Sequence, residues 1–532
     1  MTWSVWRARL VVSAAVTASA LAFALYARVE WPWFLLGWIG LTPWLAVLDR
    51  TRSLRGALAA GVLMCEAFVL AVFSWFPSAI QNYTQTPWAL ALLIVVLAAP
   101  LLQPQLITFA VARALARRGG AGLWRTAVVG ASIYVGTEWA IPKLFADTIG
   151  QGQYASAFIR QAADIAGAHG ITFVLIVANE CALAIIVRMR TRNHAASALA
   201  PAVCMSAMVC GLLAYGAWRV RQFGDEGRGG DRVTAGVVQA NISKYGQLAA
   251  QMGTFDATRM ILDAHFTLST EAMQRAALDL LVWPETVYPT TFGSPKSEDG
   301  AAFDREIGAF VTRTGVPLVF GAYDVEAGDE FNAAVFLEPA TDGRLAFDTY
   351  RKRWLFPLIE RTPAVLDAPA VRRWLPWLGT WKAGTGPQVL SLTMRDGRAL
   401  RIAPLICYDA IDPGLVIAAV RQGAEILVTL SNDSWFDWGN TPRLILIVTA
   451  FRSIETRRPQ VRATNTGISA VIDATGEFRD TIEMDRRAIM VASVVPEHAA
   501  RTLMLAWGDW FPPSALIVGL ALLASTVRYS HR

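Results

Sequence analysis

The chain has 532 residues, of which 54% are hydrophobic and only 17% are charged. This composition excludes an ordinary soluble protein of this length and favours a membrane protein. The net charge of +6 comes mostly from arginines in short loops between apolar segments, so it does not indicate a surface that binds nucleic acid.

Apolar runs of about 20 residues predict membrane-spanning helices. We expect about eight such spans, near residues 8–27, 32–48, 57–78, 88–114, 125–141, 169–188, 198–218 and 511–527. The first resembles a signal peptide, but the spans that follow at once favour a retained anchor. The expected domains are therefore a membrane domain over 1–220, a water-facing domain over 231–497, and a final span with a cytoplasmic tail over 508–532.

Basic residues in the short loops predict the orientation of the spans. Arginines cluster in alternate loops, at residues 7–9, 50–55, 113–125 and 188–192. These loops are expected in the cytoplasm. Seven crossings from a cytoplasmic start place the water-facing domain outside, so we predict a multi-pass protein of the bacterial inner membrane with its large domain on the periplasmic face.

Cysteine usage points to one unusual thiol. Cys65, Cys181, Cys204 and Cys210 lie in predicted spans, so Cys407 is alone in the water-facing block. It has no partner there for an intrachain disulfide. A free thiol in an oxidising compartment indicates a reactive group.

The water-facing block alternates short β-rich runs with helix-length stretches, which predicts a layered α/β domain. Strands are expected at 233–239, 278–283, 317–321, 333–337, 400–407, 425–431, 460–464, 468–472 and 488–494. Helices are expected at 254–276, 301–314, 411–422 and 441–456. Residues 224–230 form the predicted linker from the membrane domain.

Three reactive side chains follow predicted strands, where α/β folds assemble their sites. They are Glu285 in Trp-Pro-Glu, Lys352 in Tyr-Arg-Lys-Arg, and Cys407 in Leu-Ile-Cys-Tyr-Asp. Cys407 ends a strand just before a helix, whose positive end is expected to favour a thiolate. Only His265 lies well inside the domain, so a Cys-His mechanism is poorly supported, whereas Glu285 could take the thiol proton and Lys352 could stabilise an oxyanion.

The order of these residues is similar to the Glu-Lys-Cys triad of the nitrilase superfamily. With spans on both flanks and the runs at 431–436 and 458–467, the chain resembles the apolipoprotein N-acyltransferases more closely. That resemblance implies an α-β-β-α sandwich and transfer of an acyl chain from a phospholipid to the N-terminal amine of a diacylated lipoprotein cysteine. The acyl group would travel as a thioester, with membrane lipids as partners and no metal or other cofactor.

The resemblance also implies roles for individual residues. Glu285 would be the general base, Lys352 the oxyanion stabiliser and Cys407 the acylated nucleophile. The auxiliary or substrate-binding candidates are Glu360, which would orient the lysine, Tyr408, which would support the elbow, and Asp409, Asn432 and Trp435.

Three departures from the family pattern leave the acceptor open. After Gln239-Ala-Asn-Ile the chain reads Ser-Lys-Tyr, where the family has Pro-Gln. A Pro-x-Gln-His segment is missing after Phe436, and Asp409 replaces the usual glutamate. A membrane-tethered amidase or nitrilase-like hydrolase, or an inactive membrane scaffold, are therefore the alternative functions.

Each residue also has an ordinary structural interpretation. Glu285 alone could be a surface carboxylate, Lys352 a lipid-headgroup contact and Cys407 a small core residue. Their joint occurrence in family order favours the triad. Carboxylates in spans are functional candidates because burying them in lipid is costly, but helix packing explains them equally well; they are Glu66, Glu138 and Glu180.

Overall fold

The computed structural model describes residues 3–51, 53–190, 195–224, 232–242, 245–339, 345–434 and 441–530. The chain divides into two compact units. A helical unit comprises Met1–Gln222 and Trp507–Arg532, and an α/β unit comprises Phe223–Ala506. The predicted linker over 224–230 lies almost entirely outside the described residues.

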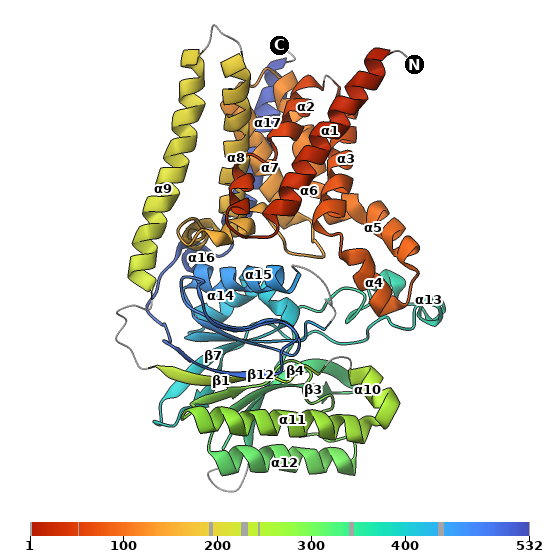
Figure 1. The fold of residues 1–532 in the computed structure, drawn as a ribbon, viewed down its shortest axis with the longest axis vertical. Coiled ribbons are helices and arrows are strands. Elements are labelled where there is room, and N and C mark those ends of the chain that lie inside the picture. Colours follow the sequence, from red (N-terminus) through yellow and green to blue (C-terminus); the bar gives the residue numbers. More distant parts are fainter. Residues whose placement is uncertain are drawn as a thin grey trace. The chain divides into compact units, whose positions relative to one another are not determined.

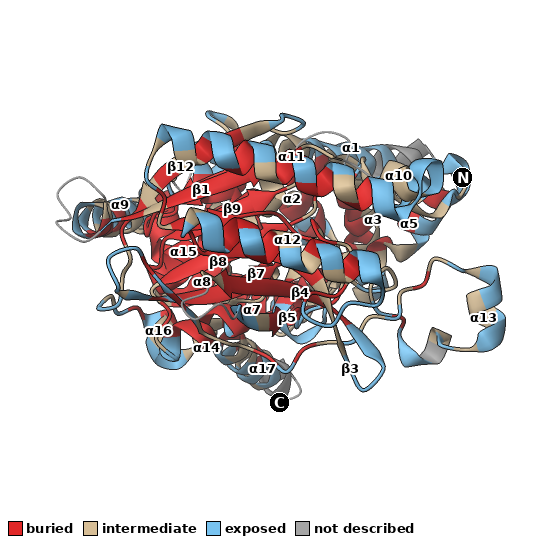
Figure 2. Ribbon diagram, turned by 90° about the horizontal axis from the view of Figure 1, so that it is seen from below, coloured by how far each residue is buried: buried red, intermediate tan, exposed pale blue. Residues whose placement is uncertain are grey.

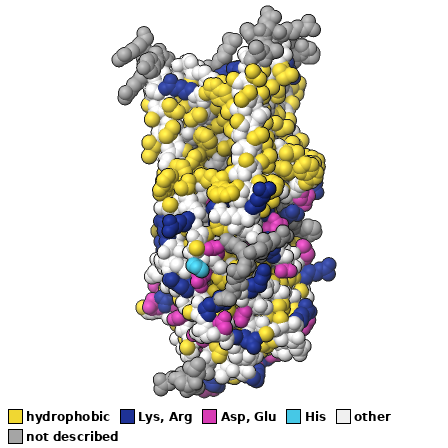
Figure 3. Space-filling model, turned by 90° about the vertical axis from the view of Figure 1, so that its left-hand side faces the viewer, with side chains coloured by type: hydrophobic (Ala, Val, Ile, Leu, Met, Phe, Trp, Pro, Cys, Tyr) yellow, Lys and Arg dark blue, Asp and Glu magenta, His cyan; other side chains and the backbone are white. Residues whose placement is uncertain are grey.

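The helical unit consists mainly of α-helices with a few short 3-10 turns (Figure 1). Its principal helices are α1 (Trp3–Tyr26), α2 (Thr42–Arg50), α3 (Leu54–Val72), α4 (Phe76–Thr84), α5 (Trp88–Leu102), α6 (Pro104–Arg118), α7 (Leu123–Ala140), α8 (Ala163–Arg190), α9 (Leu199–Phe223) and α17 (Phe511–Ser530). On the face drawn in Figure 3, hydrophobic side chains cover most of this unit, as expected for helices that contact lipid.

Fewer helices are long and apolar enough to cross a membrane than the sequence predicts. Among the described residues there are four, at Arg9–Tyr26, Leu54–Val72, Ile159–Arg190 and Leu199–Phe223, or five if the pair α5 and α6, bent by 46°, is one span. The single span expected near 32–48 is wrong, because a 3-10 helix (Trp33–Trp38) and the short α2 occupy it. The apolar part of α17 is a shorter helix, Phe511–Thr526.

Two of the three carboxylates expected in spans are paired inside the helical unit. Glu180 lies 2.5 Å from Nε of the buried Arg113, and Glu138 lies 3.1 Å from Nζ of Lys143. Because a buried charge is stable only with a partner, these pairs are sufficient to explain both carboxylates, one between α6 and α8 and the other between α7 and the loop that follows it.

The α/β unit contains two six-stranded sheets. The first has the strand order β12-β1-β2-β3-β4-β5 and the second the order β11-β10-β9-β8-β7-β6. The strands are β1 (Val233–Gln239), β2 (Leu280–Val282), β3 (Leu318–Glu326), β4 (Asp329–Glu338), β5 (Ala346–Arg351), β6 (Leu390–Thr393), β7 (Ala399–Ile406), β8 (Ile426–Ser431), β9 (Gln460–Thr464), β10 (Ser469–Ile472), β11 (Phe478–Ile482) and β12 (Ala488–Val494). The parallel pairs are β1 with β2, β2 with β3, β7 with β8, and β8 with β9.

Side-chain alternation along the strands builds the layers. In β1, Val233, Ala235 and Val237 enter the core between the two sheets, whereas Val238 packs into a second core under helices. That second core lies beneath α11 (Thr254–Arg275) and α12 (Glu298–Thr314), whose outer faces are exposed (Figure 2).

The other sheet is covered by α14 (Pro413–Arg421) and α15 (Thr441–Thr456), as Figure 1 shows. Residues of α14 form a core with β7 and β8. The order of layers is therefore helix, sheet, sheet, helix, which confirms the predicted sandwich. The short helices α10 (Tyr245–Met252), α13 (Pro369–Trp374) and α16 (Leu503–Trp507), and the strands β5, β6 and β11, were not predicted.

Candidate active site

Glu285 follows the carboxyl end of β2, and a glycine on the neighbouring strand allows its backbone to lie close. Gly321 in β3 donates its N–H to the carbonyl of Pro284 at 3.0 Å. A Cβ at Gly321 would lie 2.4 Å from the backbone nitrogen of Thr286, which has a positive φ of 59°. The sequence therefore holds Glu285 in a tight turn with its side chain buried.

Lys352 follows β5 and is also buried. Its backbone N–H donates to the carbonyl of Asn332 in β4 at 2.8 Å, which extends the β4–β5 ladder to this residue. Its Nζ lies 3.2 Å from Oε1 of Glu285 and 2.8 Å from Oε1 of Glu360. The structure thus brings the first two predicted triad residues and Glu360 together.

The two carboxylates have further hydrogen-bond donors. Nδ2 of Asn332 donates to Oε1 of Glu285 at 2.8 Å and to Oε1 of Glu360 at 3.2 Å. The backbone N–H of Asn432, after β8, donates to Oε2 of Glu285 at 2.8 Å, and that of Phe356 donates to Oε2 of Glu360 at 2.7 Å. Glu285 is therefore fixed by groups from both sheets.

Cys407 follows β7 and turns the chain into a short 3-10 helix, Cys407–Ile411. Its φ of 46° is a left-handed conformation that non-glycine residues seldom adopt. The side chain is partly buried and packs against the core between the sheets. This is a strained elbow at a strand end, of the kind that positions functional residues.

The electrostatics of the thiol differ from the sequence expectation. Burial raises the pKa of Cys407 to about 12, and the carboxylate of Glu285 acts in the same direction, while the ammonium of Lys352 lowers it. The pKa of the thiol is raised and not lowered as the sequence led us to expect, because burial and the nearby carboxylates outweigh the lysine. The thiol needs a base when it reacts.

The pKa values of Glu285 and Lys352 both differ from the ordinary values of these side chains. Burial raises the pKa of Glu285, and Lys352 offsets only part of that effect. Burial alone would lower the pKa of Lys352, but the carboxylates of Glu285 and Glu360 outweigh it, so its pKa lies well above the ordinary value. The lysine keeps its charge, and the glutamate is a stronger base than a solvent-exposed carboxylate.

Asp409 lies fully buried under the elbow. Its carboxylate accepts hydrogen bonds from the hydroxyl of Tyr350 at 2.9 Å and from the backbone N–H groups of Arg353, Trp354 and Ile406 at 3.1, 2.7 and 3.1 Å. Burial raises its pKa to about 6, and the N–H of Trp354 acts against that shift. These contacts connect the elbow to the residues just after Lys352.

The remaining predicted residues surround this centre or lie outside the described part of the chain. The ring of Tyr408 packs edge-on against Phe356 at a centroid distance of 5.1 Å. Trp435 is not among the described residues. The neighbouring Asp433 is buried and lies 2.9 Å from Nη2 of Arg462 in β9.

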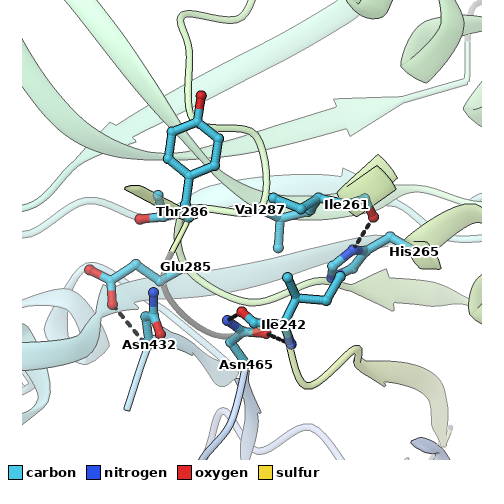
Figure 4. Close-up of a pocket in the computed structure, with 9 residues that line it drawn as sticks. Ile242, Ile261, His265, Glu285, Thr286, Val287, Asn432 and Asn465 are labelled. Carbon is cyan, nitrogen blue, oxygen red and sulfur yellow. Dashed lines mark hydrogen bonds between the residues drawn. The ribbon is translucent and has the colours of Figure 1, made fainter. Parts of the chain in front are cut away.

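A small pocket borders Glu285 (Figure 4). His265 lines it with a ring nitrogen, Nδ1, 2.8 Å from the carbonyl of Ile261. Burial lowers the pKa of His265 to about 4, although the carbonyl raises it, so the imidazole is neutral at physiological pH. The thiol does not line this pocket in the described chain.

Asn332 is the site residue that the sequence analysis missed. It lies 47 residues from Glu285 and 28 from Glu360 along the chain. The only local signal is a polar residue in the otherwise apolar run from Phe331 to Leu337. Among the described residues, no three His, Cys, Asp or Glu side chains are grouped as metal ligands would be.

Two family models match the chain. Residues 234–502 match the carbon-nitrogen hydrolase family, and residues 15–181 match the apolipoprotein N-acyltransferase N-terminal domain. The first match spans half of the chain and includes Glu285, Lys352 and Cys407. The chain belongs to the carbon-nitrogen hydrolase family.

Curated relatives share both parts of the chain. The apolipoprotein N-acyltransferase of Bdellovibrio bacteriovorus is 28% identical over 505 residues, covering 90% of this chain and 87% of that protein. That of Geobacter metallireducens is 27% identical over 468 residues, covering 86% and 85%. Among solved structures, Saccharomyces cerevisiae Nit3 of the nitrilase superfamily is 16% identical and covers 50% of this chain and 90% of its own, with a TM-score of 0.36. Within the family, the sequence relatives confirm the resemblance to apolipoprotein N-acyltransferases.

Proposed function

We propose that this chain transfers an acyl chain from a phospholipid to the N-terminal amine of a diacylated lipoprotein cysteine, through a thioester on Cys407. The observation that carries the proposal is the buried contact of Glu285 with Lys352 beside the thiol of Cys407. The same chain also has helices that are long and apolar enough to cross a membrane. Such an arrangement supplies a base, a cation and a nucleophile in one place.

In the first half-reaction, Glu285 takes the thiol proton as the sulfur of Cys407 attacks an ester carbonyl of the phospholipid. The carbon–sulfur bond forms, and the carbonyl oxygen becomes an oxyanion beside Lys352. An ammonium has three N–H donors, and the contacts to Glu285 and Glu360 use two of them among the described residues, which leaves one for the oxyanion. The intermediate collapses, and the lysophospholipid leaves as an alcohol after taking the proton from Glu285.

In the second half-reaction, the free amine of the acceptor attacks the thioester. The carbon–nitrogen bond forms, Glu285 takes a proton from the amine, and the carbon–sulfur bond breaks. The proton returns to the sulfur, so the thiol is restored and the amide product leaves. Lys352 stabilises the same oxyanion position in both half-reactions. No redox step or external cofactor is needed.

Lipid substrates require a site at a membrane surface. The four or five apolar helices provide the attachment. The arginines in alternate loops favour a cytoplasmic amino terminus and a catalytic domain on the periplasmic face of the bacterial inner membrane. This orientation needs an odd number of crossings before the α/β unit.

The test is intact-mass analysis of the purified full chain incubated with phospholipid, followed by a diacylated lipopeptide. Wild type is compared with Cys407→Ala and with Cys210→Ala, a matched control at an exposed cysteine in α9. An adduct that requires Cys407 and passes to the peptide amine supports acyl transfer. Discharge to water alone supports the hydrolase, and no adduct in wild type overturns the proposal.

A further inference from the structure

Asn332 and Lys352 bind the same two carboxylate oxygens. Oε1 of Glu285 accepts from Nζ of Lys352 at 3.2 Å and from Nδ2 of Asn332 at 2.8 Å. Oε1 of Glu360 accepts from the same two nitrogens at 2.8 and 3.2 Å. The four groups form a closed ring of two acceptors and two donors.

The strand ladder places the amide in this ring. Ala333 in β4 pairs with Arg351 in β5, and the next residue, Lys352, donates its backbone N–H to the carbonyl of Asn332 at 2.8 Å. The lysine and the asparagine are therefore neighbours through the backbone as well as through the side chains. Asn332 is 6% exposed, so water does not replace its contacts.

The other end of the amide shows which contact determines its orientation. Oδ1 of Asn332 is buried and has no hydrogen-bond partner among the described residues. An unpaired buried acceptor is costly, and it persists only where a stronger interaction fixes the group. Turning the amide over would aim Oδ1 at two carboxylates, so the carboxylates fix the amide.

We propose that Asn332 is a positioning residue that holds Glu285 and Glu360 around one lysine without adding a second positive charge. Two carboxylates at one ammonium repel each other, and a second donor is needed to keep both in place. A second cation would supply that donor but would make Glu285 a weaker base. A neutral amide supplies the hydrogen bonds and leaves most of the basicity of Glu285, on whose proposed role as base this inference rests.

The first measurement is the pH dependence of acyl-adduct formation from phospholipid in detergent micelles, for wild type and Asn332→Ala. The hydrogen bond from the side-chain amide of Asn332 lowers the pKa of Glu285, so the loss of this hydrogen bond should raise that pKa. We expect the acidic limb of the rate profile to move to higher pH by about one unit, because a hydrogen bond to a charged group has about that strength. At a pH below the limb, the rate of the variant should therefore be about tenfold lower than that of wild type. A purely structural loss would reduce the rate by one factor at every pH.

The titratable groups that act on this centre are Lys352, Glu360, Cys407, Tyr323, Tyr408 and Asp409, with Asp433 acting on the thiol. All of them are retained in the variant. The matched control is Ser269→Ala, which removes a buried hydrogen bond from Nε1 of Trp283 at 2.8 Å and touches none of these groups. Its acidic limb should coincide with that of wild type.

The second measurement is the thermal unfolding midpoint of the full chain against pH, which needs no acyl chemistry. Because Asn332 donates to ionised carboxylates, its stabilisation is present above the pKa of Glu285 and is lost as the pH falls through it. The difference between wild type and Asn332→Ala should therefore shrink at low pH, while that of Ser269→Ala stays constant. A difference independent of pH overturns the inference, whereas a wild type without adduct overturns only the proposed function.

Discussion

Replacing Glu360 by glutamine tests whether the carboxylate of Glu360 raises the pKa of Glu285. The substitution Glu360→Gln preserves size and removes one negative charge from the ring around Lys352. Glu360 raises the pKa of Glu285. Its neutralisation should therefore lower that pKa, which is the opposite of the shift expected for Asn332→Ala.

The size of this effect follows from the geometry. Both Oε1 atoms lie within hydrogen-bonding distance of Nζ of Lys352, at 3.2 and 2.8 Å, so they are at most about 6 Å apart. Two unit charges at that separation repel by about 3 kcal/mol at an effective dielectric constant of 20, which corresponds to about 2 pH units. The acidic limb of adduct formation should move down by about that amount, and the plateau rate should fall because the base is weaker.

The assay is the rate of adduct formation on Cys407 by intact mass, measured across the acidic limb. The matched control is Asp367→Asn on the same loop, where the carboxylate pairs with Arg372 at 2.7 Å and is half exposed. That control should leave the limb unchanged, since an exposed pair is screened by solvent. If Glu360→Gln moves the limb upward or not at all, the electrostatic coupling inferred for the ring is wrong.

Three further predictions concern the elbow. Asp409→Ala leaves four donors without an acceptor, of which the Tyr350 hydroxyl and the Ile406 N–H are buried. It should lower the free energy of unfolding by about 3 kcal/mol in chemical denaturation, with a smaller loss for Asp409→Asn. Cys407→Gly should be more stable than Cys407→Ala by about 1 kcal/mol in the same assay, because φ is 46° there, and equal stability would contradict strain. Alkylation of Cys407 by iodoacetamide should be slow at neutral pH because burial raises the thiol pKa, and slower still in Lys352→Met because the ammonium lowers that pKa. Faster alkylation of Lys352→Met by mass spectrometry would contradict this prediction.

The sequence predicted the parts of the site that have local signals. Glu285, Lys352 and Cys407 each follow a strand, and a reactive residue at a strand end is visible in a short stretch of sequence. Asn332 has no such signal, because its partners are distant along the chain and are brought near only by the pairing of β4 with β5. A lone asparagine in an apolar strand becomes informative only when its neighbours are known.

The strands that were missed share one physical property. β5, β6 and β11 each lie at the end of a sheet. An edge strand is half solvated, so it lacks the apolar run or clean alternation that identifies a central strand. A different limitation applies to the helical unit. There, the high apolar content near residues 32–48 predicted one membrane-spanning helix. Pro32 and Gly40 interrupt the predicted helix, and the apolar composition of a segment does not reveal such helix-breaking residues.

The charge state of the thiol depends on three-dimensional surroundings that no short motif contains. Burial acts on Cys407 and Glu285 in the same direction and raises the pKa of both. The free energy of moving the proton from sulfur to carboxylate depends on the difference between the two pKa values, so a shared shift largely cancels. Under the proposed roles, the remaining cost is met only when a carbonyl carbon is in place and its oxygen gains the charge beside Lys352. Deprotonation of the thiol should therefore occur together with its attack on the acyl donor, which keeps the resting site in its neutral thiol form.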